Sequence, residues 1–416
     1  MRSPTRPVPQ PGTPPGAPWT GHERGTPGYR RTTVALFAAG VATFAQLYSV
    51  QAVLPALADG LHLTAPRAAL SVSVATGALA VSVVGWSALA DRVGRVPVMV
   101  VSAVLATALG LAVPLAPGLG PLLVLRALQG AALGGLPAVA MAHLAEEVHA
   151  REVALAAGAY VAGNSLGGLT GRIVSAGVAD LLGWRWGVAA VAVTGLAATA
   201  VFCAVVPRAR GFAPTTSRGV AGRVRRALTD PSLLVLHAQA LLLMGSFVTV
   251  YNYLGFRLLQ PPFSLSQTVV GLLFVVYLAG TLSSSLAGRL AARGRLPVLL
   301  GSTGVFVAGC LLTLATGLPV VVTGLVLLTA GFFAAHAVAS GWVGARADPG
   351  IRAQASALYT FAYYAGSSVV GWLTGFAFGA GGWGVVVAVV TALAAGAAVL
   401  AALGLRGRDR AGSMGS

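Results

Sequence analysis

The segment SALADRVGRVP (residues 87–97) returns about 200 residues later as GRLAARGRLP (residues 288–297), with one residue fewer. A second pair shows a similar offset, because Leu47-Tyr48 parallels Val250-Tyr251. Each copy of the loop follows the second long apolar run of its part of the chain. This internal repeat predicts two similar halves, joined by the longest internal polar segment, Arg208–Asp230.

The composition is that of a polytopic membrane protein. Of the 416 residues, 56% are hydrophobic and 9% are charged, whereas about 25% are charged in soluble proteins. The mean hydropathy of +0.82 excludes an ordinary cytosolic enzyme or secreted domain. Both cysteines, Cys203 and Cys310, lie inside apolar runs, so no disulfide framework is predicted.

Twelve apolar runs are long enough to cross a bilayer, since a spanning helix needs about 20 apolar residues. Lipid offers peptide groups no hydrogen-bond partner, so these runs are expected to be helices. The predicted fold class is an all-α polytopic membrane protein with 12 transmembrane helices in two pseudo-symmetric six-helix halves. The predicted spans are 33–55, 68–90, 96–116, 119–145, 152–178, 184–206, 232–256, 266–290, 296–316, 318–342, 353–378 and 383–405.

The same pattern predicts the domain boundaries. A proline-rich, polar segment precedes the first span and is expected to be disordered. The predicted units are a cytoplasmic tail (1–31), an N-terminal half (32–206), a basic cytoplasmic linker (207–231), a C-terminal half (232–406) and a second tail (407–416).

Arginine placement predicts the orientation. All 27 basic residues are arginine, and 22 of them lie in the tails and in the loops on the side of the N-terminus, against three in the opposite loops. Positive charge marks cytoplasmic loops, so both termini are predicted to be cytoplasmic in a multi-pass protein of the cell inner (plasma) membrane. This distribution also argues against nucleic-acid binding, which the net charge of +17 alone would suggest.

Several segments carry a family resemblance. The loop LADRVGR (89–95) resembles the loop motif of the major facilitator superfamily, and LRALQG (125–130) with GGLP (134–137) resembles the fourth-helix motif of its proton-coupled members. Three more segments resemble a bacterial branch of the twelve-helix drug:proton antiporter group, often labelled sugar- or arabinose-efflux permeases: GAYVAGNSLGG (158–168), YNYLGFR (251–257) and PPFSLSQ (261–267). The resemblance spans roughly residues 32–406.

The resemblance implies secondary active transport by alternating access, with proton-coupled efflux of a small solute that is sugar-like, drug-like or another metabolite. Uptake or facilitated diffusion by the same fold remains the alternative. The loop motif normally begins with glycine, where this chain has Ser87, and carries a further basic residue, where this chain has Val96. The fifth span also lacks the Gly-Pro pair of many drug antiporters, which weighs against a multidrug role.

No enzymatic activity is expected. A nucleotide-binding loop of the Walker type needs a lysine, and the chain has none. One dense polar cluster, around Glu146, Glu147, His149 and Glu152, is explained by a solvated loop, so a membrane-embedded enzyme is a distant alternative. The expected partners are a small-molecule substrate, protons and the lipid bilayer, with no nucleic acid, metal or cofactor, and the chain is expected to function as a monomer.

The loop after the second span is a candidate conformational latch, formed by Asp91, Arg92, Gly94, Arg95, Glu146 and Glu147. The resemblance implies that Asp91 holds the halves together against the start of the eleventh span, near Ala353. Arg92 and Arg95 are expected to pair with Glu146 or Glu147. The alternative is that Asp91 is only a helix-end charge.

Two arginines, Arg126 and Arg172, lie well inside predicted spans rather than at their ends. A charge there costs about 2.5–3.5 kcal/mol or more, and no acidic residue lies deep in a span. Arg126 is therefore expected to bond to carbonyls, water, substrate or amides such as Gln51, Gln129 and Asn164. The resemblance implies a role in proton coupling; the alternative is a structural arginine that ties the fourth span to the first. Arg172 is expected to extend to the headgroups, with a place in the substrate cavity as the alternative.

The remaining candidates are polar groups and glycines. His143, His237 and His336 are titratable, although a packing role is favoured over a functional one for His237 and His336. Tyrosines and amides near the outer ends of the first and seventh spans suit a polar uncharged solute or an interfacial aromatic belt: Tyr48, Gln51, Tyr251, Asn252 and Tyr253. Glycines spaced by four residues predict close helix packing: Gly163, Gly167, Gly171, Gly371 and Gly375.

Overall fold

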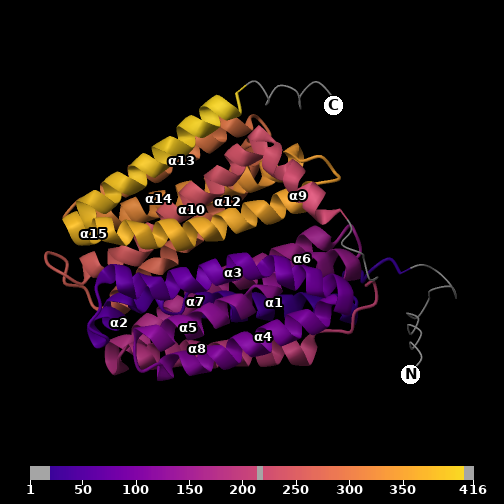
Figure 1. The fold of residues 1–416 in the computed structure, drawn as a ribbon, viewed down its shortest axis with the longest axis horizontal. Helices are drawn as coiled ribbons and strands as arrows, with labels where there is room; N and C mark the ends of the chain where they lie inside the picture. Colours follow the sequence, from indigo (N-terminus) through magenta and orange to yellow (C-terminus); the bar gives the residue numbers. More distant parts are fainter. Residues whose placement is uncertain (1–18, 213–218, 407–416) are drawn as a thin grey trace.

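The computed structural model describes residues 19–212 and 219–406, and nearly all of these residues are helical (Figure 1). In chain order the elements are α1 (Pro27–Leu47), η1 (Gln51–Val53), α2 (Leu54–Gly60), α3 (Ala65–Val93), α4 (Arg95–Ala112), η2 (Val113–Leu115), α5 (Leu119–Leu133), α6 (Gly135–Glu147), α7 (Val153–Leu182), α8 (Trp184–Val205), α9 (Val220–Thr229), α10 (Pro231–Leu258), α11 (Gln267–Leu272), η3 (Leu273–Val276), α12 (Tyr277–Leu290), α13 (Arg295–Leu312), α14 (Leu318–Arg346) and α15 (Arg352–Gly404).

The described residues form twelve membrane crossings, as the sequence predicts. Ten segments have the length and composition of a crossing. One of them, α15, has 53 residues, about 80 Å at 1.5 Å per residue, against a hydrocarbon core of about 30 Å. Its backbone leaves the helical region at Gly381 and Gly382, and φ at Gly382 is +66°, so glycine permits a turn between two crossings. Because α15 contains two crossings, the ten segments give eleven crossings. The twelfth is α7, which packs against α1 and α8.

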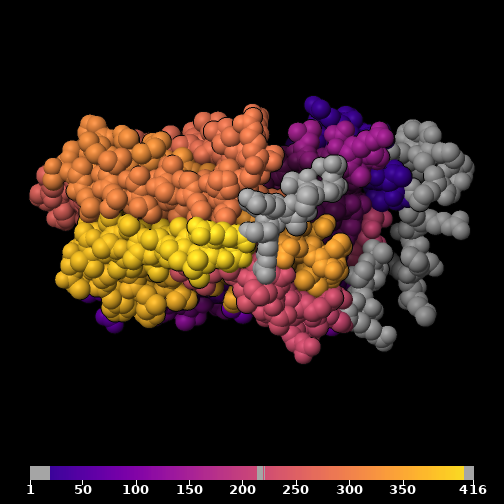
Figure 2. Space-filling view, turned by 90° about the horizontal axis from the view of Figure 1, so that it is seen from above, coloured from indigo at the N-terminus to yellow at the C-terminus, as the bar shows by residue number. Residues whose placement is uncertain are grey.

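The crossings form two layers (Figure 1). Helices α1–α8 make one layer and α10–α15 make the other, with α3 packed along α15 at the boundary. The start of α1 and the end of α15 lie at one end of the bundle, together with α9; we call it the terminal end. The opposite end, with α2 and the Gly381–Gly382 turn, is the distal end. Figure 2 shows mainly the C-terminal half, and the purple surface of the N-terminal half emerges near the terminal end and along one long edge.

The first helix begins earlier than predicted. The Thr26 side chain accepts a hydrogen bond from Tyr29 N (3.2 Å), and Pro27 occupies the first turn, which is a typical helix start. The expectation of disorder is therefore wrong for residues 27–31. His22 is also held in place, because its N–H donates to Glu147 O (2.8 Å). The rest of that predicted tail, residues 1–18, and the tail 407–416 lie outside the described residues.

Glycines bring backbones together, as their spacing predicts. A Cβ atom on Gly163, Gly167 or Gly171 would lie 2.3, 2.5 or 2.6 Å from carbonyl oxygens of α1, so α7 packs directly on that backbone. Gly371 faces α10, where a Cβ atom would lie 3.3 Å from a valine side chain. A Cβ atom on Gly375 would lie 3.0 Å from Pro66 Cα of α3, so this glycine lies where the two halves touch.

Candidate substrate cavity between the halves

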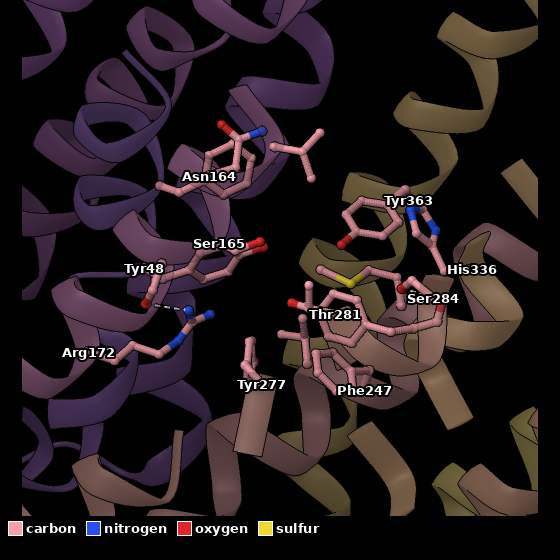
Figure 3. A pocket seen from close by; sticks show the side chains of 16 residues that line it. Tyr48, Asn164, Ser165, Arg172, Phe247, Tyr277, Thr281, Ser284, His336 and Tyr363 are labelled. Carbon is pink, nitrogen blue, oxygen red and sulfur yellow. Dashed lines mark hydrogen bonds between the residues drawn. The ribbon is translucent and has the colours of Figure 1, made fainter. Parts of the chain in front are cut away.

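A cavity of about 290 Å³ lies between the two halves (Figure 3). Its N-terminal wall comes from α7 and the C-terminal end of α1, and its C-terminal wall comes from α10, α12, α14 and α15. The volume is close to the lower end of the range of about 300–1,000 Å³ for small-molecule sites. The cavity therefore has the size and the place expected for the substrate site of a two-half transporter.

The two walls differ in chemistry. The N-terminal wall carries Asn164, Ser165 and Arg172 on one face of α7 (Figure 3). The C-terminal wall is largely aromatic. Phe247 stacks on Phe332 with a centroid distance of 4.0 Å, and rings from α12, α14 and α15 extend the cluster. A bound solute would thus contact a polar, cationic wall on one side and an aromatic wall on the other.

Arg172 lines this cavity, so the expectation that it extends to the headgroups is wrong. Its side chain is 3% exposed. Nε donates to Gln51 Oε1 (2.8 Å), and Nη1 donates to Gly168 O (2.7 Å). The guanidinium carbon lies 4.3 Å from the ring centroid of Tyr48, 4.9 Å from that of Tyr277 and 5.0 Å from that of Phe274. Because α7 continues to Leu182, the charge lies too deep to reach the interface.

An amide bridge closes the distal side of the cavity. Gln51, which accepts from Arg172, donates through Nε2 to Asn252 Oδ1 across the halves (2.8 Å). Both amides are almost fully buried. The sequence prediction placed them at an outer mouth; the structure shows them bonded to each other, so that they block that mouth.

Further contacts join the halves near the distal end. The carboxylate of Asp180, at the end of α7, accepts hydrogen bonds from Gln267 N (3.2 Å), Thr268 N (3.3 Å) and Thr268 Oγ1 (2.7 Å), and so caps α11. Gln267 Nε2 donates to the carbonyl of Ala52. Deeper in the bundle, Ser368 Oγ donates to Ser73 O (2.7 Å). Sequence reasoning missed Asp180, because its partners follow 87 and 88 residues later.

Arg126 is fully buried but does not line the cavity. It donates to Ser71 O (3.0 Å), Gln46 O (3.1 Å), Leu47 O (2.5 Å) and Gln129 Oε1 (2.5 Å). Two of these acceptors end α1, where a cation is favourable. This geometry fits the structural alternative, in which Arg126 ties the fourth crossing to the first.

The histidines have different surroundings. His336 lines the cavity, and its Nδ1 lies 3.0 Å from the hydroxyl of Tyr359. Within the described residues its Nε2 makes no hydrogen bond. His237 instead bonds to the carbonyl of Ala355 (3.1 Å) within the C-terminal half, away from the cavity lining. His143 is buried in α6, and neither ring nitrogen has a hydrogen-bond partner among the described residues.

The two tyrosines of α10 also have different surroundings. Tyr251 belongs to the aromatic cluster beside the cavity, and its hydroxyl bonds to Thr329 (2.7 Å). Tyr253 points elsewhere, and its hydroxyl donates to Gly371 O of α15 (3.0 Å). Neither residue lines the cavity itself. Asn164 does, and Tyr48 does so from the end of α1.

The predicted latch residues cluster at the terminal end, but within one half. Arg95, 8% exposed, binds Asp91 Oδ1 through Nη1 (2.5 Å) and Glu146 Oε1 through Nη2 (2.9 Å). Gly94, with φ of +105°, makes the turn between α3 and α4. Among the described residues Asp91 pairs with Arg95 rather than with the start of α15, so the expected contact near Ala353 is absent from this conformation.

Of the expected pairings with Glu146 and Glu147, the one between Arg95 and Glu146 is present, and the others are absent among the described residues. Arg92 is exposed and pairs with neither Glu146 nor Glu147 within the described residues. Glu147 instead accepts from Arg210 N (2.6 Å) and Gly211 N (2.7 Å) of the linker. The sequence did not reveal this, because backbone donors in a loop carry no residue signature.

Known proteins resemble the chain over most of its length. The sequence profile of the Major Facilitator Superfamily matches residues 36–261. The inner membrane transport protein YnfM of Escherichia coli (strain K12) is 43% identical over 364 residues, 87% of each chain. The MFS-type transporter YybF of Bacillus subtilis (strain 168) is 40% identical over 373 residues, 88% of this chain and 92% of its own.

Solved structures share the fold. A bacterial homologue of the human lysosomal transporter Spinster, inward-facing and occupied, has a TM-score of 0.74 at 15% identity, with 92% of this chain and 97% of that chain covered. A D-xylose–proton symporter has a TM-score of 0.69 at 16% identity, covering 90% and 96%. With the interfacial cavity and the twelve crossings, these matches show that the chain belongs to the major facilitator superfamily of membrane transporters.

Proposed function

We propose that the chain exports a small solute across the cytoplasmic membrane in exchange for protons. The observation that carries this proposal is the cavity between the halves, in which Arg172 faces the titratable His336 across a space for a solute (Figure 3). Alternating access then exposes the cavity first on one side and next on the other. The YnfM relative is an inner membrane transport protein by name, which fits the proposed location.

The arginine distribution supports a cytoplasmic terminal end. The hydrogen bonds that join the halves around Asp180, Gln51 and Ser368 lie distal to the terminal-end cluster around Arg95. With the terminal end in the cytoplasm, the closed distal side faces outward, and we infer that a cytoplasmic solute enters this conformation from the terminal end. An exporter loads its substrate in such a state.

The cluster of Arg95, Asp91 and Glu146 at the terminal end supports a role as a conformational latch. In the present conformation Arg95 holds both Asp91 and Glu146 inside the N-terminal half. When the terminal ends approach each other, Asp91 is free to face the first turn of α15, where the positive end of a helix favours a carboxylate. The domain limits 32–206 and 232–406 then describe the two moving bodies, and α9 lies in the linker between them.

Proton coupling is assigned to His336 rather than to Arg126. An arginine side chain keeps its proton, and Arg126 donates four hydrogen bonds to carbonyl and amide acceptors. Among the described residues His336 Nε2 makes no hydrogen bond, His336 lines the solute space, and an imidazole, unlike a guanidinium, can gain and lose a proton. Protonation of His336 would add positive charge to a cavity that already contains Arg172, so the charge of the cavity would follow the pH of the side to which it opens.

Flux in everted membrane vesicles tests this function. Everted vesicles that contain the chain are incubated with candidate solutes in the outer medium, with and without an imposed pH gradient, acid inside. Uptake that needs the gradient and collapses with a protonophore supports antiport. Equilibration of the solute at the same rate with and without the gradient would eliminate antiport and favour facilitated diffusion. Movement of the solute out of the vesicles together with protons would favour an uptake transporter.

A further inference from the structure

Arg172 is a buried cation that forms no ion pair with any carboxylate of the described residues. In residues 19–212 and 219–406 the ion pairs within 4.0 Å both involve Arg95 at the terminal end. The described cavity-lining residues include no aspartate or glutamate. A desolvated charge without a counter-ion is costly, so the site gains from a negative partner.

The donors of Arg172 are only partly used. Nε binds Gln51 and Nη1 binds the carbonyl of Gly168, whereas Nη2 makes no hydrogen bond within the described residues. Both existing partners are neutral. Figure 3 shows the guanidinium directed into the space between the walls. An acceptor that arrives in the cavity would therefore find a free N–H donor and an uncompensated positive charge together.

The surrounding rings fix where that acceptor can sit. Tyr48, Phe274 and Tyr277 place their faces 4.3–5.0 Å from the guanidinium carbon. These faces hold the cation but offer a bound anion no hydrogen bond. Across the cavity Phe247 and Phe333 belong to the aromatic wall. This wall favours the apolar or aromatic body of a solute and disfavours a fully hydroxylated one.

We propose that the cavity binds a small organic monoanion, with its carboxylate on Arg172 and its apolar or aromatic body against the ring wall of α10, α12 and α14. This inference rests on the proposed transport function, and it names the substrate class of the same site. One buried cation suits one negative charge, and the cavity of about 290 Å³ suits a small body. It departs from the polar uncharged solute that the tyrosines and amides of the sequence suggest.

The test uses three ligands with one body on the purified full-length chain in detergent: phenylacetate, its neutral amide phenylacetamide, and the cation phenethylamine. Ligand binding raises the thermal unfolding midpoint, and its concentration dependence yields an apparent Kd. We expect phenylacetate to bind, and the amide and the amine to bind at least about tenfold more weakly. This comparison uses the wild-type chain, so it does not depend on whether a variant folds.

Variants locate the anion. Arg172→Gln removes the charge, Arg172→Lys keeps it without the planar fork, and Arg67→Gln is a matched control, because Arg67 is exposed near the distal end of α3. Phenylacetate binding should weaken about tenfold or more in Arg172→Gln, less in Arg172→Lys, and stay unchanged in Arg67→Gln.

Three results would overturn the proposal: no phenylacetate binding at millimolar concentration, equal affinity for the amide, or an unchanged Kd in Arg172→Gln. Arg172 would then be a structural part of the distal closure. No pH gradient is involved in these measurements. A failure here leaves the antiport proposal intact, and gradient-independent flux in vesicles leaves the anion site intact.

Discussion

Removing the carboxylate of Asp180 should open the distal side of the bundle. Asp180 ends α7 in the N-terminal half and accepts three hydrogen bonds from Gln267 and Thr268 at the start of α11 in the C-terminal half. It is therefore a helix cap supplied across the two halves. Asp180→Ala removes this cap and leaves both helices intact.

The free energy that Asp180 contributes to the distal-closed state follows from its geometry. A carboxylate at a helix N-terminus contributes about 0.3–1 kcal/mol when exposed, and a helix cap is typically worth about 1 kcal/mol. Asp180 is exposed, so solvent screening keeps the total near about 1 kcal/mol rather than the sum of three charged hydrogen bonds. A loss of about 1 kcal/mol changes the ratio of distal-closed to distal-open molecules by about fivefold.

Thiol accessibility measures that ratio. Ala52→Cys is introduced into a chain whose two native cysteines are replaced, because Ala52 is 3% exposed and its carbonyl accepts from Gln267 of the other half. We expect Asp180→Ala to increase the labelling rate with a membrane-impermeant maleimide about fivefold. The matched control is Asp59→Ala, an exposed acid of α2. Equal rates in the Asp180 variant and in this control would refute the reasoning.

Four further results are expected. Asp91→Asn should insert normally but slow vesicle flux, because an amide binds Arg95 and a helix N-terminus less well than a carboxylate; wild-type flux would contradict the latch. Arg126→Met leaves buried carbonyl acceptors without a partner, so it should cost about 3 kcal/mol of stability, seen as a lower unfolding midpoint in detergent. Gly130→Ala would place a Cβ atom 2.0 Å from a carbonyl of α3 and should reduce the folded yield, whereas Gly158→Ala, with open space, should not. His336→Gln should abolish the pH dependence of flux while keeping gradient-independent exchange, and unchanged pH dependence would exclude His336 as the proton carrier.

The crossings were predictable because the bilayer imposes a length and a composition on each of them. The run 184–206 is α8, Trp184–Val205, and the run 232–256 is α10, Pro231–Leu258. The residues at which the helices begin and end were less predictable. Arg30 and Arg31 made the start of α1 look like a polar tail, although Thr26 and Pro27 carry the local signal of a helix start.

The site was predictable only where its partners are near in sequence or share a motif. Arg95 binds Glu146, one of the two partners named for it from the loop motif, whereas its bond to Asp91 four residues away was not expected. The depth of Arg172 was misjudged because the predicted fifth span stopped at residue 178, whereas α7 continues through Leu182. The aromatic wall needs side chains from four crossings, and no local pattern reports which faces of these helices meet.

The strength of the distal closure has a consequence for transport. A transporter must populate both access states, so the free energy between them has to be small. The structure meets this condition with an exposed carboxylate cap at Asp180 and one buried amide bridge from Gln51 to Asn252. That bridge is incomplete, because Asn252 Nδ2 has no hydrogen-bond partner among the described residues. An unpaired buried donor costs about 1–3 kcal/mol, which offsets what the bridge contributes and keeps the closed state easy to leave.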